Sequence, residues 1–318
     1  MQIAVQQELT SFALDVAEGL TRARKKLSPR YFYDELGSAL FQAITLLPEY
    51  GLTRADERLL EEHAPAITAQ LRTPSLVAEL GSGDGSKTSH VLRAAHRAGQ
   101  LPTYYPVDIS PAALEGCQQE LGSLAHVRPI LTDYLTGLRQ VQDQRTEGDQ
   151  LLLLFLGSTI GNFERETVPE FLENVRSFLK PGDLFLVGAD LIKPEAMLVD
   201  AYDDSLGVTA AFNLNLLRRI NTELGGNFDL RAFRHRAVWN AEHRRIEIHL
   251  LSSVEQVVFV EALQFAVSFH EGETIWTESC HKFTVDELQA FGCEAGFEIV
   301  ATWIDQEWPF AESLWRAR

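Results

Sequence analysis

The sequence predicts an α/β protein built on a doubly wound parallel sheet. Strand and helix patterns alternate from Ser75 onward, as they do in sheets whose strands are joined by right-handed crossover helices. Residues 151–156, LLLLFL, are apolar at every position, which is typical of a strand covered on both faces. A glycine-rich segment, GSGDGS, separates the first strand from its helix, as it does where a backbone approaches a ligand closely.

The N-terminal part of the chain has a helical pattern. Apolar residues recur at three- and four-residue spacing over residues 8–71, with breaks at Ser28-Pro29 and near Pro48. The first strand is then SLVAEL, and a helix over residues 87–98 follows it.

The alternation continues as far as Lys193. TYYPVDIS predicts the second strand, and Pro111 opens the next helix, PAALEGCQQELGSL, at its first turn. HVRPILTDY, LLLLFLGST and DLFLVGADL predict three further strands. The helix VPEFLENVRSFL lies between the last two and ends before Pro181.

Beyond Lys193 the pattern changes. Residues 195–221 predict a helix, and HRAVWNAEHRRIEIHLLSS predicts two strands around a polar turn, with further strands up to residue 282. A last helix begins at Thr284, followed by the strand FEIVATWID. We therefore expect an N-terminal helical part, a sheet domain, an insertion, and the last helix and strand of the sheet domain, over residues 1–60, 61–195, 196–282 and 283–318.

The charge balance favours a small-molecule partner. The chain has 45 acidic and 28 basic residues, a formal net charge of −17, which opposes binding to a phosphate backbone. Hydrophobic residues make up 45% of the chain, enough for a sizeable core. We expect no nucleic-acid partner.

Other features predict a cytoplasmic protein without a metal. Cys117, Cys280 and Cys293 are unevenly spaced and indicate no disulfide framework, and no HExxH or paired CxxC pattern indicates a metal site. The N-terminus predicts an amphipathic helix without the basic region of a signal peptide, and no apolar run could span a bilayer. We expect a monomer with no membrane partner.

The loop Gly81-Ser82-Gly83-Asp84-Gly85 admits several ligands. A P-loop needs a glycine before Lys87-Thr88, where this chain has Ser86, and Glu79 would repel a triphosphate. A dinucleotide fingerprint also needs a glycine at position 86. A tight turn with no ligand remains an alternative.

S-adenosylmethionine fits this loop better, because it carries no phosphate. Asp108 ends the second strand, where a carboxylate can accept both ribose hydroxyls, and Asp133 follows the third strand, on the adenine side. Each acid alone is typical of a solvated loop. Together with Glu79 and Gly81, however, they lie at the carboxyl ends of strands, the edge where doubly wound sheets bind ligands.

Several segments together resemble the histidine Nα-methyltransferases of the ergothioneine pathway. They are SPRYFYDELGSALFQAITLLPEYGLTRAD, ELGSGDGSKT, FLGSTIGNF, GADLIKP, AYDDSLGVTAAFNLN and TESCHKF, within about residues 8 to 318. The resemblance implies a Rossmann-like methyltransferase domain, and a substrate-binding domain made from the N-terminal helices and the late insertion. It also implies transfer of up to three methyl groups from S-adenosylmethionine to the α-amino group of free L-histidine, giving the betaine hercynine.

The resemblance also implies roles for individual residues. The cofactor would be held by Gly81, Lys87, Asp108, Asp133 and Tyr134. The amino and carboxylate groups of the substrate would be held by Asn162 and Tyr202, and its imidazole by Glu278. The pocket would be closed by Tyr33, Phe41 and Tyr50. Alternatives are a helix N-cap for Asn162, a helix surface for Tyr202 and an aromatic core for the other three.

The chain departs from the family pattern at three positions, of which Ile248 and Cys280 belong to the imidazole side of the pocket. Ile248 stands where the pattern has Met, Cys280 where it has Ser, and Gly51 where it has a second tyrosine. A thiol is a weaker hydrogen-bond donor than a hydroxyl. The alternatives are therefore an N-methyltransferase for another free amino acid, such as tryptophan, or a non-catalytic S-adenosylmethionine-binding regulator. We assign no general base.

Overall fold

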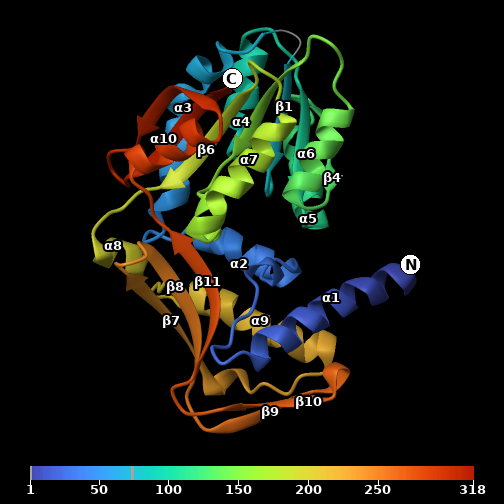
Figure 1. Ribbon diagram of the computed structural model, residues 1–318, viewed down its shortest axis with the longest axis vertical. Helices are drawn as coiled ribbons and strands as arrows, with labels where there is room; N and C mark the ends of the chain where they lie inside the picture. Colours follow the sequence, from blue (N-terminus) through green and yellow to red (C-terminus); the bar gives the residue numbers. More distant parts are fainter. Residues whose placement is uncertain (1, 73–74) are drawn as a thin grey trace. The chain divides into compact units, whose positions relative to one another are not determined.

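The computed structural model describes residues 2–72 and 75–318, which form two compact units (Figure 1). One comprises Gly51–Lys193 and His281–Arg318 and is called the sheet unit below. The other comprises the chain up to Tyr50 and Pro194–Cys280 and is called the insert unit.

The sheet unit contains one large sheet, which confirms the predicted α/β fold. Its strand order is β12-β13-β6-β5-β1-β2-β3, and β4 pairs with β2. The strands from β1 to β6 pair in parallel, whereas β13 is antiparallel to both of its neighbours. The strands are β1 Ser75–Leu80, β2 Thr103–Asp108, β3 His126–Val127, β4 Ile130–Leu131, β5 Gln150–Phe155, β6 Leu184–Asp190, β12 Phe297–Ile304 and β13 Phe310–Ala317.

Apolar layers cover both faces of this sheet, as the continuous apolar strands require. Every residue of β1, β5 and β6 is buried. One face packs against α3 (Gly51–Thr68), α4 (Thr88–Arg97) and α5 (Pro111–Leu121). The other face packs against α6 (Tyr134–Asp143), α7 (Val168–Phe178) and α10 (Val285–Glu294).

Local signals explain where several helices begin. Pro111 opens α5 behind the N-cap Ser110, whose hydroxyl accepts a hydrogen bond from the Ala113 N–H. Thr284 and Glu287 form a capping box at the start of α10. Both helices begin where their sequence signals place them.

Two elements were not predicted. The segment FAESLWRA forms β13, which inserts between β6 and β12 and makes the sheet mixed instead of parallel. Helix α6 follows the third strand, with Asp133 as its N-cap. The strand predicted at HVRPILTDY is also two short pieces, β3 and β4, separated by Arg128 and Pro129, because proline has no N–H for a ladder.

The insert unit combines helices with two small sheets, ordered β11-β8-β7 and β10-β9. Gly207, with φ +74°, separates two helices where the sequence predicted one over residues 195–221. The helices are α1 Gln2–Thr21, α2 Glu35–Thr45, α8 Glu195–Asp200 and α9 Val208–Leu224. The strands are β7 Phe233–Asn240, β8 Arg245–Ser252, β9 Gln256–Val260, β10 Phe265–Phe269 and β11 Thr274–His281.

The units divide at residues 50, 193 and 280, compared with expected boundaries at 60, 195 and 282. The first differs most because α3 packs against α4 and β13 within the sheet unit. No helix within the described ranges is long and apolar enough to cross a membrane.

The ends of the sheet-unit segments meet at Asp190. Its buried carboxylate forms ion pairs with Lys193 and Lys282 and accepts a hydrogen bond from Trp308 Nε1 at 2.9 Å. A Cβ on Gly51 would lie 2.3 Å from the Trp308 ring, so glycine lets the chain pass against this indole. One acid therefore ties together the positions where the chain enters and leaves this unit.

Asp183 supports the amino ends of the strands. Its carboxylate accepts hydrogen bonds from Arg145 Nη1 and Nη2 at 2.6 and 2.7 Å, and both side chains are buried. It also accepts from the backbone N–H groups of Leu151 and Lys180 at 2.9 and 2.7 Å.

Replacing Asp183 with alanine should lower the free energy of unfolding by about 3–5 kcal/mol, because Arg145 would remain buried with an unpaired charge. Urea unfolding followed by circular dichroism measures this loss. The control is Glu18→Ala, which removes the exposed partner of Arg22 and should change stability little. Equal unfolding midpoints for Asp183→Ala and the parent would contradict the assigned role.

Candidate cofactor and substrate sites

The glycine-rich loop turns sharply at the carboxyl end of β1. Gly81, Gly83 and Gly85 have φ values of +76°, +55° and +76°, in the left-handed region that favours glycine. The N–H groups of Gly81 and Ser82 donate to the Val107 carbonyl at 2.8 and 3.3 Å, which fixes the loop against β2. A Cβ on Gly83 would meet no atom within 4 Å, so the loop is open on that side.

Asp108 lies at the end of β2, beside the open glycine. One carboxylate oxygen accepts from the Gly83 N–H at 3.0 Å and the other from the Ser110 N–H at 2.9 Å. Burial raises the pKa of Asp108, although these backbone hydrogen bonds oppose the shift. Each oxygen keeps a further lone pair, so the carboxylate can still accept hydrogen bonds from a diol.

Tyr134 and Asp133 follow β4. The Tyr134 hydroxyl lies 3.3 Å from the position that a Cβ on Gly81 would take, and burial raises its pKa to about 12. Asp133 is exposed, and one of its oxygens accepts from the Thr136 N–H at 3.0 Å. Burial alone would raise the pKa of Asp133, but hydrogen bonds from Thr136 and from the neighbouring backbone together outweigh burial, and the pKa is lowered. The structure thus brings Tyr134 to the loop and uses Asp133 as an N-cap.

Lys87 lies at the start of α4, with its ammonium held by Asp56. Nζ is 2.8 Å from Asp56 Oδ2, and the side chain is 23% exposed. A Cβ on Gly157 would lie 2.7 Å from Nζ, so glycine at this position leaves the ammonium room under the end of β5. An ammonium has three donors, and within the described residues Lys87 uses one on Asp56.

Glu79 differs from the other acids at this edge. It is buried below the loop, where it accepts hydrogen bonds from Thr88 and Tyr104, and burial raises its pKa to about 7. These groups together fit S-adenosylmethionine. Gly83 leaves room for close approach, Asp108 offers acceptors to a ribose, and Lys87 offers donors to a carboxylate.

Asn162 ends a short 3₁₀ turn, Thr159–Asn162, that follows β5. Its side chain is exposed and makes no hydrogen bond to another described residue. The alternative of a helix N-cap is wrong, because Thr167 is the N-cap of α7. The preceding Ser158 has φ +59°, a strained backbone for a residue with a side chain, and such strain is concentrated at functional sites.

Four aromatic side chains predicted to close the pocket or bind substrate lie in the insert unit. Tyr50 and Tyr202 are buried and meet edge to face, with ring centroids 5.9 Å apart. Because Tyr202 is buried, the alternative of a helix-surface residue is wrong. Tyr33 and Phe41 are 5.6 Å apart, and both also contact the Phe212 ring.

Glu278, Cys280 and Ile248 lie on adjacent strands of the insert unit. Glu278 and Cys280 are buried in β11, two residues apart and therefore on one face of the strand. Ile248 is buried in β8, where its carbonyl accepts from the Thr277 hydroxyl at 3.0 Å. An acid and a thiol on one face can accept and donate hydrogen bonds to the same polar group.

Sequence reasoning gave no role to Asp56 or Glu312, which are buried beside Lys87. Asp56 lies at helical spacing from the buried residues Leu52 and Leu59, so an acid on an apolar helix face was a usable signal. Glu312 could not be found in this way, because its strand was not predicted.

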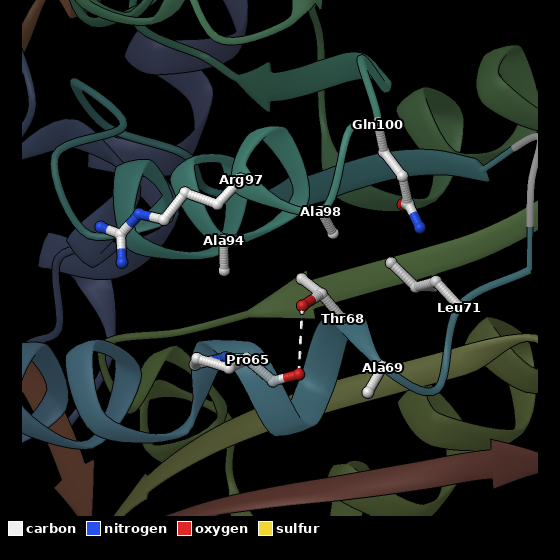
Figure 2. Close-up of a pocket in the computed structure, with 8 residues that line it drawn as sticks. All are labelled: Pro65, Thr68, Ala69, Leu71, Ala94, Arg97, Ala98 and Gln100. Carbon is white, nitrogen blue, oxygen red and sulfur yellow. Dashed lines mark hydrogen bonds between the residues drawn. The ribbon is translucent and has the colours of Figure 1, made fainter.

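A cavity of about 420 Å³ lies elsewhere, between the C-terminal ends of α3 and α4 (Figure 2). The Thr68 hydroxyl beside it is satisfied by the carbonyls of Ala64 and Pro65, and Arg97 and Gln100 supply its longer polar side chains. None of the predicted site residues lines it, so it is not the candidate site.

A family model for histidine-specific, S-adenosylmethionine-dependent methyltransferases matches residues 12–317. The chain belongs to this family. S-adenosylmethionine is therefore the methyl donor of this enzyme.

Similar proteins cover nearly the whole chain. The histidine N-alpha-methyltransferase of Mycolicibacterium smegmatis is 40% identical over 301 residues, which are 94% of this chain and 93% of that protein. The Mycobacterium tuberculosis protein of the same name is 38% identical over 304 residues, with the same two shares. An L-tryptophan methyltransferase of Psilocybe serbica is 26% identical over 323 residues, covering 92% of this chain and 89% of its own.

Asp108→Ala should weaken binding of S-adenosylhomocysteine by about 1–3 kcal/mol, because ligand hydroxyls lose an acceptor and Gly83 loses its anchor. Isothermal titration calorimetry on the folded variant measures the change. Asp84→Ala is the matched control, because Asp84 is exposed in the same loop and, among the described residues, accepts a hydrogen bond only from the Ser86 N–H. An unchanged dissociation constant for Asp108→Ala would remove this residue from the cofactor site.

Proposed function

We propose that this enzyme methylates the α-amino group of free L-histidine up to the Nα-trimethyl betaine hercynine, as in ergothioneine biosynthesis. Membership of a histidine-specific family is the observation that carries the proposal. The buried carboxylate of Glu278 supports it, because a carboxylate can accept a hydrogen bond from an imidazole N–H.

S-adenosylmethionine, when bound, supplies a methyl group activated by its sulfonium. The chain itself mainly performs a positioning task. We assign Gly81, Lys87, Asp108, Asp133 and Tyr134 to the cofactor. Asn162 and Tyr202 hold the amino and carboxylate groups of the substrate, so that the nitrogen lone pair points at the methyl carbon.

The reaction needs a neutral amine, so the α-ammonium must first lose its proton. We assign no side chain as a dedicated general base, and water accepts this proton. As the methyl group moves, positive charge develops on the nitrogen, and acidic surroundings stabilise it. Tyr50, Tyr33 and Phe41 exclude water from the pocket in this proposal.

The choice of substrate depends on the residues that face the substrate's side chain. Glu278 accepts a hydrogen bond from the ring, and a site built around a buried polar group rejects ligands that leave it unsatisfied. Cys280 and Ile248 line the same side, and the thiol is the weaker donor there. A tryptophan methyltransferase among the relatives makes tryptophan the second candidate substrate.

We also propose a cytoplasmic monomer that acts on a small molecule, with neither nucleic acid nor membrane as a partner. The net charge of −17 and the absence of a cysteine framework in the sequence support this proposal.

Histidine should exceed phenylalanine, leucine and tryptophan in kcat/KM for the unmodified enzyme. The assay incubates each free amino acid with S-adenosylmethionine and reads products heavier by one, two or three methyl groups by mass spectrometry. Methylation of no amino acid, with cofactor binding intact, would favour the regulator alternative. A higher kcat/KM for tryptophan than for histidine would instead indicate that Ile248 and Cys280 have changed the substrate specificity.

Glu278→Ala should lower kcat/KM for histidine by about 100-fold or more, because the ring loses a charged acceptor that contributes about 3 kcal/mol. The ratio of kcat/KM for histidine to kcat/KM for tryptophan should also fall in the same variant. Glu271→Ala is the control, because Glu271 is exposed in the turn before β11. If Glu278→Ala keeps the full preference for histidine, Glu278 does not recognise the ring.

A further inference from the structure

A buried layer of ionisable side chains lies at the carboxyl edge of the sheet, on the face covered by α3 and α4. Glu79 in β1 and Glu312 in β13 each lie two residues from an apolar core residue, Val77 and Leu314, and so continue that face. Asp56 reaches the same layer from α3 and pairs with Lys87. Three carboxyl groups thus surround one ammonium.

All three carboxyl groups cannot be ionised in so small a buried volume. Asp56 Oδ2 accepts from Lys87 Nζ at 2.8 Å and from the Gly157 N–H at 2.9 Å, so Asp56 carries the charge that balances the ammonium. Glu79 accepts from Thr88 and Tyr104. Burial, and then the neighbouring Asp56, raise the pKa of Glu312 well above its usual range.

The carboxyl groups of Glu312 and Asp56 can form a hydrogen bond with each other only if one of them carries a proton. Within the described residues, no N–H or O–H group donates to Asp56 Oδ1 or to either oxygen of Glu312. The two carboxyl groups are hydrogen-bond neighbours, so a protonated Glu312 donates to Asp56. Gly188, opposite Glu312 in the strand register, makes this possible, because a Cβ there would lie 2.6 Å from Glu312 Oε1.

We infer that Asp56 and Glu312 are positioning residues that hold the Lys87 ammonium under Gly157, where it binds the carboxylate of the methyl donor. The inference rests on the assignment of Lys87 to the cofactor in the proposed function. Asp56 uses one ammonium donor and leaves two for the ligand. The protonated Glu312 donates to Oδ1 of Asp56. This oxygen is then not available to Lys87 Nζ, which contacts Asp56 through Oδ2 alone and keeps its other donors for the ligand.

The test is isothermal titration calorimetry of the full chain with S-adenosylhomocysteine, which has the same carboxylate as the donor. Asp56→Asn should weaken binding about tenfold or more, because an amide no longer balances the Lys87 charge. Glu312→Gln should stay within about threefold of the parent, since an amide N–H replaces the acid proton, whereas Glu312→Ala should lose about fivefold. The KM for the amino acid at saturating donor should not change in Glu312→Ala.

Two further variants make the result specific. Asp305→Asn removes the charge of one of the two carboxylate partners of Arg58, which lies on the same helix as Asp56, and this variant should bind with parental affinity. Lys87→Met should bind at least as weakly as Asp56→Asn. If Asp56→Asn does not fold, the inference is tested by comparing the affinities of Glu312→Gln and Glu312→Ala for S-adenosylhomocysteine.

The inference is overturned by parental affinity in Asp56→Asn, by equal losses in Glu312→Gln and Glu312→Ala, or by an equal loss in Asp305→Asn. Parental affinity in Lys87→Met would overturn both this inference and the role assigned to Lys87. If the calorimetric results are as expected but no amino acid is methylated, the proposed function fails and the positioning role stands.

Discussion

The left-handed turn between β1 and α4 determines where the cofactor-binding groups of the sheet unit lie. Three glycines with positive φ turn the chain across the end of β2, and two N–H groups of the loop share the Val107 carbonyl. This places the Gly83 N–H on Asp108 and the Gly81 backbone beneath Tyr134. Lys87 then follows at the first turn of α4, close enough to Asp56 for an ion pair. A side chain at any of these glycines would strain the turn.

Paired buried charges recur at both ends of the strands in the same sheet. Asp183 and Arg145 join the amino ends of β5 and β6, whereas Asp190 binds two lysines at the carboxyl end of β6. An isolated buried charge is costly, so each acid has a cation or a donor network to offset its desolvation. The cluster around Lys87 differs because it holds more acids than bases. A proton must therefore complete it.

The sequence was sufficient for the central fold, because continuous apolar strands and strong helix starts such as Ser110-Pro111 and Thr284 are local signals. It also led to the glycine loop and Asp108. It was insufficient for β13, whose residues FAESLWRA place two polar side chains inside the sheet and so lack a clear strand pattern. Glu312 is buried beside Asp56 and Lys87, which come from distant parts of the chain. Helix α6 was also missed, because its N-cap Asp133 was interpreted only as an acid after a strand, and such an acid can also begin a helix.

The position of β13 has a consequence for dissecting the protein. Residues 51–193 contain every residue assigned to the cofactor, but β13 pairs along the full length of β6 and comes from the other end of the chain. A fragment cut at residue 193 would expose the edge of β6, an apolar strand with unpaired backbone groups and a ready template for aggregation. The same cut removes Lys282 and Trp308 from Asp190. A minimal donor-binding fragment must therefore rejoin residues 51–193 to residues 281–318 through a linker that replaces the insertion.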